Sequence, residues 1–212
     1  MADPLLSIDE LIVEFDTDEG LVRAVDGLSL TVEAGKTLGI VGESGCGKSV
    51  TALAVMRLLP QPMGNIAGGT IHFQGQNLAS LPISEMEKIR GAGIGMVFQE
   101  LNLCPNLSVV DNIFLARETT RKDGLIARRT QKKLAQELLG KLEQKIDPDE
   151  LLSDLRIGEQ QIVEITKALA QDVRILIMDE PTSALSATEV EVLFRVICEL
   201  KSNGVAIIYI SH

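Results

Sequence analysis

The strongest constraint on the fold is a glycine-rich loop between an apolar run and a helical run. The loop reads Gly42-Glu43-Ser44-Gly45-Cys46-Gly47-Lys48-Ser49, which fits the spacing G-x-x-x-x-G-K-[ST]. Residues 37–41 before it are typical of a strand, and residues 50–59 after it predict a helix. The glycines permit backbone angles that turn successive N–H groups toward an anion at the helix N-terminus. The sequence therefore predicts a strand–loop–helix unit that binds phosphate.

Individual residues of this loop have expected roles. Lys48 is expected to reach the β- and γ-phosphates of a nucleotide, and the Ser49 hydroxyl is expected to hold Mg²⁺. The predicted nucleotide contacts of this stretch are Gly42, Glu43, Ser44, Gly45, Cys46, Gly47, Lys48, Ser49 and Val50. Cys46 is interpreted as a small filler at a permissive position. Because kinases, GTPases, motors and transporters share such a loop, the loop alone does not name the function.

Composition narrows the choice of partners and compartment. The formal net charge of −10 indicates no general basic surface for nucleic acid. Three widely spaced cysteines predict neither a disulfide framework nor a metal centre, and they favour a reducing compartment. No stretch is apolar enough to cross a bilayer, and the first four residues lack the basic start of a signal peptide. We therefore expect a cytosolic chain whose membrane role runs through a partner.

The flanking segments predict a β-rich beginning and a helical middle. Strands are expected over residues 5–15, 22–32 (as one or two strands), 68–73, 94–98, 175–180 and 205–210, with a turn at 74–77. Helices are expected over 82–90, 109–116, 129–144, 155–170 and 188–203. The basic cluster Arg128, Arg129, Lys132 and Lys133 is interpreted as a solvated helix face, because Glu137 follows Lys133 at helical spacing. Phe15 either stacks on adenine or fills the core, and the residues leave both readings open.

Two carboxylates end the apolar run Ile175-Leu176-Ile177-Met178-Asp179-Glu180. A continuous apolar run is typical of a buried parallel strand, and α/β sheets place ligands at the carboxyl ends of such strands. Asp179 is therefore predicted to coordinate Mg²⁺, and Glu180 to polarise the attacking water as general base. The helix that opens near Gly158 is a weaker candidate for a second phosphate contact.

Five motifs in order resemble the nucleotide-binding subunit of an ABC transporter. They are the P-loop, Gln99 after a strand, Gly158-Glu159-Gln160-Gln161 at a helix start, the Asp-Glu-Pro-Thr strand end and Ser211-His212. The resemblance covers essentially the whole chain. It implies an α/β P-loop NTPase of ABC type, with a mainly parallel core sheet flanked by helices, an N-terminal antiparallel β-subdomain and a helical subdomain. Because the family continues beyond the position of His212, we expect a truncated C-terminal end.

The resemblance also implies site residues and a subdivision of the chain. It implies adenine stacking by Phe15 and contact with a partner's ATP through Arg156, Gly158 and Glu159. The implied catalytic residues are Glu180, His212 and Gln99, the implied metal contacts are Ser49, Gln99 and Asp179, and the implied cofactors are ATP and Mg²⁺. A single ABC ATPase domain over 1–212 would comprise a β-subdomain with the P-loop part of the core (1–99), a helical subdomain (100–157) and the rest of the core (158–212).

In that family two cassettes pair head to tail, and each ATP lies between one P-loop and the partner's signature. The implied partners are transmembrane permease subunits, a second cassette and a solute-binding protein, with no nucleic acid. The implied location is peripheral, on the cytoplasmic face of the plasma (inner) membrane.

The two halves resemble different importers. Residues 43–59 and Arg90-Gly91 are similar to dipeptide and oligopeptide importers, whereas residues 99–103, 158–165 and 209–212 are similar to monosaccharide (ribose-type) importers. The helical segment docks on the membrane partner in this family, so we favour a sugar over a peptide as the transported solute. A recombined or artificially joined chain is an open alternative.

Two departures from the family pattern leave open whether the chain hydrolyses ATP at a productive rate. Arg156 replaces the usual Ser of the signature, and Ser186 replaces an acid in the D-loop, Ser183 to Ser186. Two other readings therefore stay open. One is a soluble ABC ATPase outside transport, and the other is a truncated or degenerate nucleotide-binding module with little turnover.

Overall fold

The computed structural model describes residues 4–120 and 124–212, which divide into two compact units. Unit 1 consists of the described residues up to Gly95, together with Val173–Asp179 and Leu200–His212. Unit 2 consists of the described part of Met96–Asp172 together with Glu180–Glu199. Within these described ranges, no helix combines the length and the apolar character that a membrane span requires.

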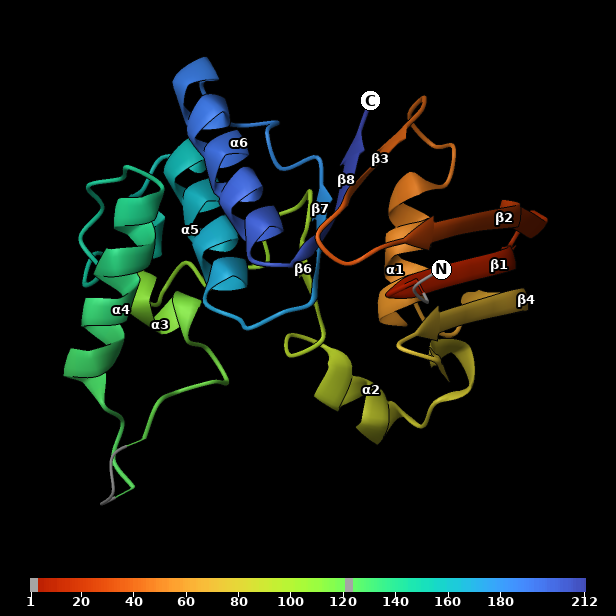
Figure 1. Ribbon diagram of the computed structural model, residues 1–212, viewed down its shortest axis with the longest axis horizontal. Coiled ribbons are helices and arrows are strands. Elements are labelled where there is room, and N and C mark those ends of the chain that lie inside the picture. Colours follow the sequence, from red (N-terminus) through yellow and green to blue (C-terminus); the bar gives the residue numbers. More distant parts are fainter. Residues whose placement is uncertain (1–3, 121–123) are drawn as a thin grey trace. The chain divides into compact units, whose positions relative to one another are not determined.

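Unit 1 contains an antiparallel sheet with the strand order β2-β1-β4-β5. Its strands are β1 (Leu6–Thr17), β2 (Gly20–Val32), β4 (Gly64–Phe73) and β5 (Gln76–Asn77), and β1, β2 and β4 lie side by side in Figure 1. A single strand covers the predicted 22–32 segment. Gly27, with φ +71°, is the extra residue where the register shifts opposite Leu11 and Ile12, so the strand continues through a β-bulge.

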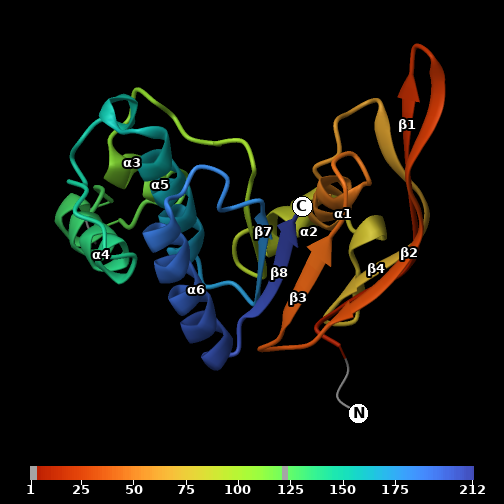
Figure 2. The ribbon, with the colours of Figure 1, turned by 90° about the horizontal axis from the view of Figure 1, so that it is seen from above.

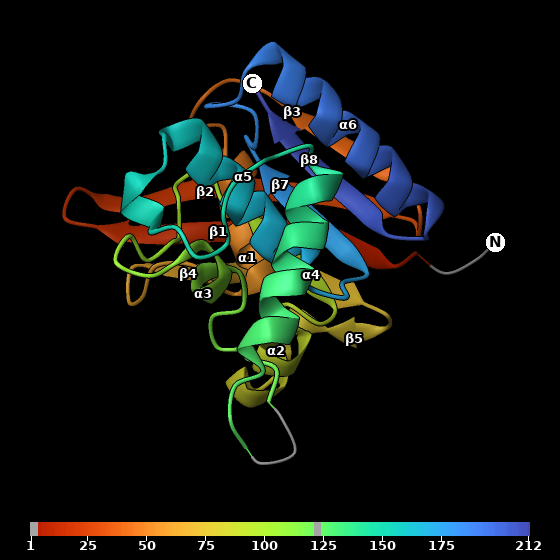
Figure 3. The same cartoon turned by 90° about the vertical axis from the view of Figure 1, so that its left-hand side faces the viewer.

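The turn predicted at 74–77 is wrong in its second half. Gln74 and Gly75 take φ +49° and +80° and make the turn. Gln76 and Asn77 instead pair with β4 and form β5, which is labelled in Figure 3.

The second sheet has the strand order β3-β8-β7-β6. Its strands are β3 (Thr37–Val41), β8 (Ala206–Ser211), β7 (Ile175–Asp179) and β6 (Ile94–Val97), of which only the first half of β6 belongs to unit 1. β3, β8 and β7 are parallel and lie side by side in Figure 2. Every residue of β7 is buried, which confirms the predicted buried parallel strand.

Helix α1 (Lys48–Met56) packs against β1 and β2 of the first sheet and against β7 of the second. Its Ala52 and Val55 are 3% and 1% exposed and share an apolar core with Ile8 and Ile177. Burial of this face therefore fixes the N-terminus of α1 within unit 1. The chain then continues through β4 and β5 to η1 (Leu78–Ser80) and α2 (Ile83–Ile89).

Unit 2 is helical. It contains α3 (Val109–Ile113), α4 (Arg128–Lys141), η2 (Leu152–Asp154), α5 (Ile157–Leu169) and α6 (Ala187–Ser202), whose last three residues belong to unit 1. α5 packs against α3 and α4 (Figure 3). α3 ends before the predicted Ala116, which takes φ +60° and cannot continue the helix. The predicted solvated face of α4 is confirmed, since Lys133 Nζ lies 3.6 Å from Glu137 Oε1 at the surface.

Candidate nucleotide site

The phosphate-binding loop joins β3 to α1 within unit 1. Gly45 and Gly47 take φ +82° and +90°, and a Cβ on Gly47 would lie 2.4 Å from the carbonyl oxygen of Ala24. No L side chain fits so close an approach to β2. The glycines therefore let the loop pass against β2 and turn into α1, whose free N–H groups and dipole favour an anion.

Lys48 is buried at the start of α1, with 8% of its surface exposed. Its Nζ donates to the carbonyl oxygens of Gly42 at 2.6 Å and Glu43 at 2.8 Å, and lies 3.8 Å from Cys46 Sγ. The carbonyl partners are uncharged, and Lys48 forms no ion pair with the described residues, so its ammonium keeps a positive charge inside the loop. A phosphate would form stronger, charge-assisted hydrogen bonds with this ammonium than the carbonyls do.

Three predicted site segments meet at one edge of the parallel sheet of unit 1. In the sheet register, Val41 pairs with Ser211, and Ile210 pairs with Asp179. The carboxyl ends of β3, β8 and β7 are therefore level. This places Gly42, at the start of the loop, with His212 and Asp179 at the edge where α/β sheets bind ligands.

The residues of this edge fit Mg²⁺. Asp179 is 4% exposed and supplies a carboxylate, and Ser49, the second residue of α1, supplies a hydroxyl. Both are hard oxygen donors of the kind that Mg²⁺ takes, usually with one or two protein groups and substrate phosphates completing the shell. Among the described residues, no cluster of three or more His, Cys, Asp or Glu side chains could hold a metal without such help.

Gln99 and Glu180 lie together in unit 2. The Gln99 side-chain amide donates to Glu180 Oε2 at 3.1 Å. Glu180 is half-buried and takes φ +47°, in the left-handed region that residues with a side chain rarely adopt. Such backbone strain clusters at functional sites, which supports a functional role for this carboxylate.

The start of helix α5, next to Arg156, lies in unit 2, and Glu159 accepts hydrogen bonds there. The Arg156 N–H donates to Glu159 Oε2 at 2.9 Å, and its guanidinium donates to Glu159 Oε1 at 3.3 Å. The Arg156 side chain is 88% exposed. A Cβ on Gly158 would lie 3.0 Å from the carbonyl oxygen of Ala184, so a side chain there would crowd the segment before α6.

Sequence reasoning missed Glu189. Ser186 donates to Glu189 Oε2 through its N–H at 2.8 Å and its hydroxyl at 2.7 Å, and these bonds lower the pKa of Glu189. The positive charge of Arg156 lowers this pKa further, so Glu189 is a second carboxylate within the field of that guanidinium. The spacing Ser-x-x-Glu is that of a capping box and would have identified the pair.

Phe15 packs within the antiparallel sheet. It lies opposite Val22 and Gly64, and a Cβ on Gly64 would lie 2.8 Å from its Cε1 atom. The ring therefore covers the backbone of Gly64 and remains half-buried. Adenine stacking by Phe15 stays a prediction.

The profile of the ABC transporter family matches residues 25–183. The chain belongs to the ABC transporter family. This stretch holds the phosphate-binding loop, Gln99, the α5 helix start and the Asp179–Glu180 pair. Membership of this family supports the predicted role in ATP binding.

Curated relatives are import ATP-binding proteins. The ribose import ATP-binding protein RbsA of Rhodopirellula baltica is 44% identical over 193 residues, which is 90% of this chain and 36% of the relative. Ribose import ATP-binding protein RbsA 3 of Rubrobacter xylanophilus is 43% identical over 194 residues, which is 90% of this chain and 37% of the relative. The chain thus spans little more than a third of the length of these proteins.

Solved structures confirm the fold class. A dimeric ATP-binding cassette in a post-hydrolysis state with ADP and Pi matches 98% of this chain and 88% of its own, with a TM-score of 0.86 and 25% identity. A nucleotide-free cassette from an ABC transporter covers 99% of this chain and 82% of its own, with a TM-score of 0.76 and 20% identity, and shows the fold alone.

Proposed function

We propose that this ABC cassette hydrolyses ATP to drive import of a sugar, with ribose-type monosaccharides as the preferred class. The observation that carries the solute class is the 43–44% identity to ribose import proteins across 90% of the chain. These relatives give no support to a peptide solute. The level carboxyl ends of β3, β8 and β7 support the ATP site, because they gather the phosphate loop and Asp179 at one edge.

The proposed chemistry is in-line attack of water on the γ-phosphate, which breaks the bond from the γ-phosphorus to the β–γ bridging oxygen and releases ADP and phosphate. Glu180 accepts the proton of the attacking water, and the Gln99 amide orients the Glu180 carboxylate. Lys48 leaves the loop carbonyls for the phosphate oxygens, and Ser49 and Asp179 would hold the metal, with Gln99 as a further contact. Mg²⁺, when bound, offsets the negative charge that develops on the transferred group.

Assembly completes the proposed site. A second cassette supplies Arg156, Gly158 and Glu159 to the ATP, and His212 senses the γ-phosphate. Transmembrane permease subunits and a solute-binding protein are the further partners, which would hold the cassette at the cytoplasmic face of the membrane. The name of the relatives, ribose import ATP-binding protein, supports an importing complex, and the dimeric solved cassette supports the second cassette.

The base assignment is tested by Glu180→Gln. Removing the proton acceptor lowers the ATPase rate by about 10²- to 10⁴-fold and leaves ATP affinity within twofold. The rate is measured by phosphate release and the affinity by calorimetry. The matched control is Glu137→Gln, the same change at an exposed ion pair of α4. Equal ATPase rates in Glu180→Gln and the parent would refute the assignment.

The solute and the alternatives are tested with the complex. Membrane partners that copurify with the cassette are reconstituted, and ATPase stimulation is compared for ribose, a dipeptide and nucleic acid. Stimulation by ribose alone supports the proposal. Stimulation by nucleic acid supports a soluble ATPase instead, and ATP binding without turnover supports a degenerate module.

A further inference from the structure

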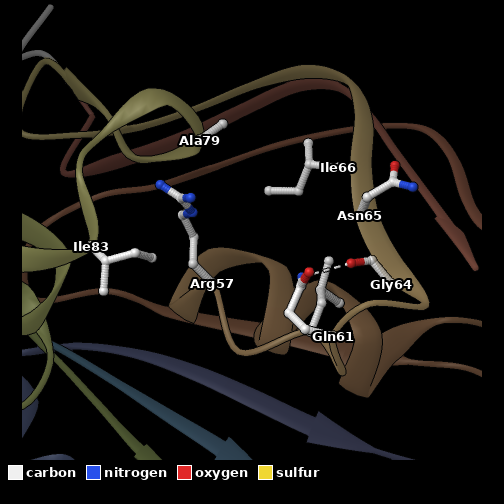
Figure 4. A pocket seen from close by; sticks show the side chains of 8 residues that line it. Arg57, Gln61, Gly64, Asn65, Ile66, Ala79 and Ile83 are labelled. Carbon is white, nitrogen blue, oxygen red and sulfur yellow. Dashed lines mark hydrogen bonds between the residues drawn. The ribbon is translucent and has the colours of Figure 1, made fainter.

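Unit 1 carries a cavity of about 460 Å³ that includes none of the predicted nucleotide contacts. It lies between the C-terminal end of α1, the start of β4 and the segment from η1 to α2 (Figure 4). Its side chains are one arginine, two amides and four apolar groups, namely Arg57, Gln61, Asn65, Leu59, Ile66, Ala79 and Ile83. The volume lies in the range of small-molecule sites.

The cation of the cavity has no charged partner in the part of the chain that the structure describes. Arg57 forms no ion pair with any residue in the described ranges, and no carboxylate belongs to the residues that line the cavity. Figure 4 shows its guanidinium on the side of Ile83, with the amides of Gln61 and Asn65 across from it. A half-buried guanidinium without a counter-ion attracts an anion.

Hydrogen bonds fix the orientation of this guanidinium. Nη1 of Arg57 donates to the carbonyl oxygens of Leu78 (3.2 Å) and Leu81, which uses both of its N–H groups. The edge formed by Nε and Nη2 donates no hydrogen bond to the described residues. That edge matches the two oxygens of a carboxylate in bidentate geometry. At the same time, Arg90 donates to the carbonyl oxygen of Arg57 at 2.9 Å and holds its backbone.

Apart from the amides of Gln61 and Asn65, the remaining side chains of the walls are apolar. Leu59 is buried, Ile66 is half-buried, and Ile83 is 53% exposed at the rim. A single cation beside an apolar wall suits a monovalent anion with a hydrophobic body better than inorganic phosphate, which carries more charge and no apolar surface. We propose that this cavity binds a small organic carboxylate, with the carboxylate on Arg57 and the apolar body against Leu59, Ile66 and Ile83.

The test uses 4-phenylbutanoate as the probe and the full chain as the protein. NMR titration is expected to shift the Arg57 Nε–H and the backbone amides of Asn65 and Ile66, with a dissociation constant of about 1 mM for a ligand of this size. The uncharged 4-phenylbutanol and inorganic phosphate are titrated in parallel and are expected to bind at least tenfold more weakly. Equal binding of the alcohol, or tighter binding of phosphate, overturns the proposal.

Two variants separate the cavity from the proposed ATP site. Arg57→Lys keeps the positive charge but loses the planar guanidinium. It is expected to weaken binding of the probe tenfold or more and to leave ATP affinity unchanged. Ala79→Phe fills the cavity without touching the hydrogen bonds of Arg57, and decides the question if Arg57→Lys does not fold. Lys48→Met should retain probe binding whether or not it binds ATP. Undiminished probe binding in Ala79→Phe overturns the proposal.

Discussion

Lys48 in unit 1 and Arg156 in unit 2 are both predicted to meet phosphate, but their surroundings are opposite. Lys48 is 8% exposed and is held by neutral carbonyl oxygens, whereas the Arg156 side chain is 88% exposed and is held by the carboxylate of Glu159. A cation held by neutral carbonyls has no competing anion, whereas a cation paired with a carboxylate gives up part of that ion pair when it binds another anion. Lys48 and Arg156 should therefore differ in how much each one contributes to binding the phosphates of ATP.

The interior of unit 2 contains buried polar side chains. Three buried side-chain atoms of unit 2, Gln131 Nε2, Gln161 Nε2 and Glu164 Oε2, meet no hydrogen-bond partner among the described residues. The buried Lys48 of unit 1, by contrast, has two close acceptors. Buried polar atoms without partners cost about 1–3 kcal/mol each. Of these three side chains only Glu164 can ionise, so its replacement by a neutral side chain can add stability.

Lys48→Met gives the largest expected effect on ATP affinity. The substitution removes the buried positive charge of the loop. ATP affinity should fall by about a hundredfold or more, because two charge-assisted hydrogen bonds to phosphate are lost. Calorimetric titration with ATP measures the change. Lys36→Met, at an exposed lysine just before β3, is the matched control and should bind ATP like the parent. An affinity loss below about threefold would show that Lys48 does not meet the nucleotide.

Arg156→Ser should have a smaller effect, because the guanidinium is exposed and shared with Glu159. We expect the ATPase rate to fall by about tenfold, the value of one charged hydrogen bond of about 1.4 kcal/mol. The ATPase rate is measured as steady-state hydrolysis at several protein concentrations. Arg23→Ser, at an exposed ion-paired arginine of β2, is the control. A large gain in hydrolysis would mean instead that Arg156 impairs the signature.

The sequence predicted the phosphate loop, the buried β7 strand and the Asp179–Glu180 pair, because local spacing alone encodes them. It could not predict that Lys48 bonds the loop carbonyls or that Glu159 binds Arg156, because these contacts depend on side-chain conformations. The β5 pairing was missed for a related reason. Its two residues gain strand geometry from β4 and not from their own propensity.

Glu164→Gln tests the interior of unit 2. Burial raises the pKa of Glu164, and the charge of Lys167 only partly opposes this. Since the folded-state pKa lies above the unfolded value, the parent loses stability as pH rises through the folded pKa, and Gln cannot ionise. Near pH 4 the two proteins should unfold alike, and at pH 8 the variant should be more stable by about 1 kcal/mol. Urea unfolding at both values measures the difference, and Glu137→Gln should show none.

Glu159→Gln has the smallest expected effect and tests directly whether the Glu159 carboxylate weakens the contribution of Arg156. The Gln side-chain oxygen can still accept the Arg156 N–H that Glu159 now accepts at 2.9 Å, while the ion pair with the guanidinium is lost. Freed from that carboxylate, Arg156 should attract a partner's phosphate more strongly, and hydrolysis should rise by about two- to fivefold, the range of an exposed ion pair. The gain should shrink as salt is raised, because exposed charges are screened. Glu85→Gln removes a comparable exposed pair, with Lys88 on α2, and should leave the rate unchanged. A fall in the rate would show that Glu159 positions Arg156 for phosphate and does not compete with it.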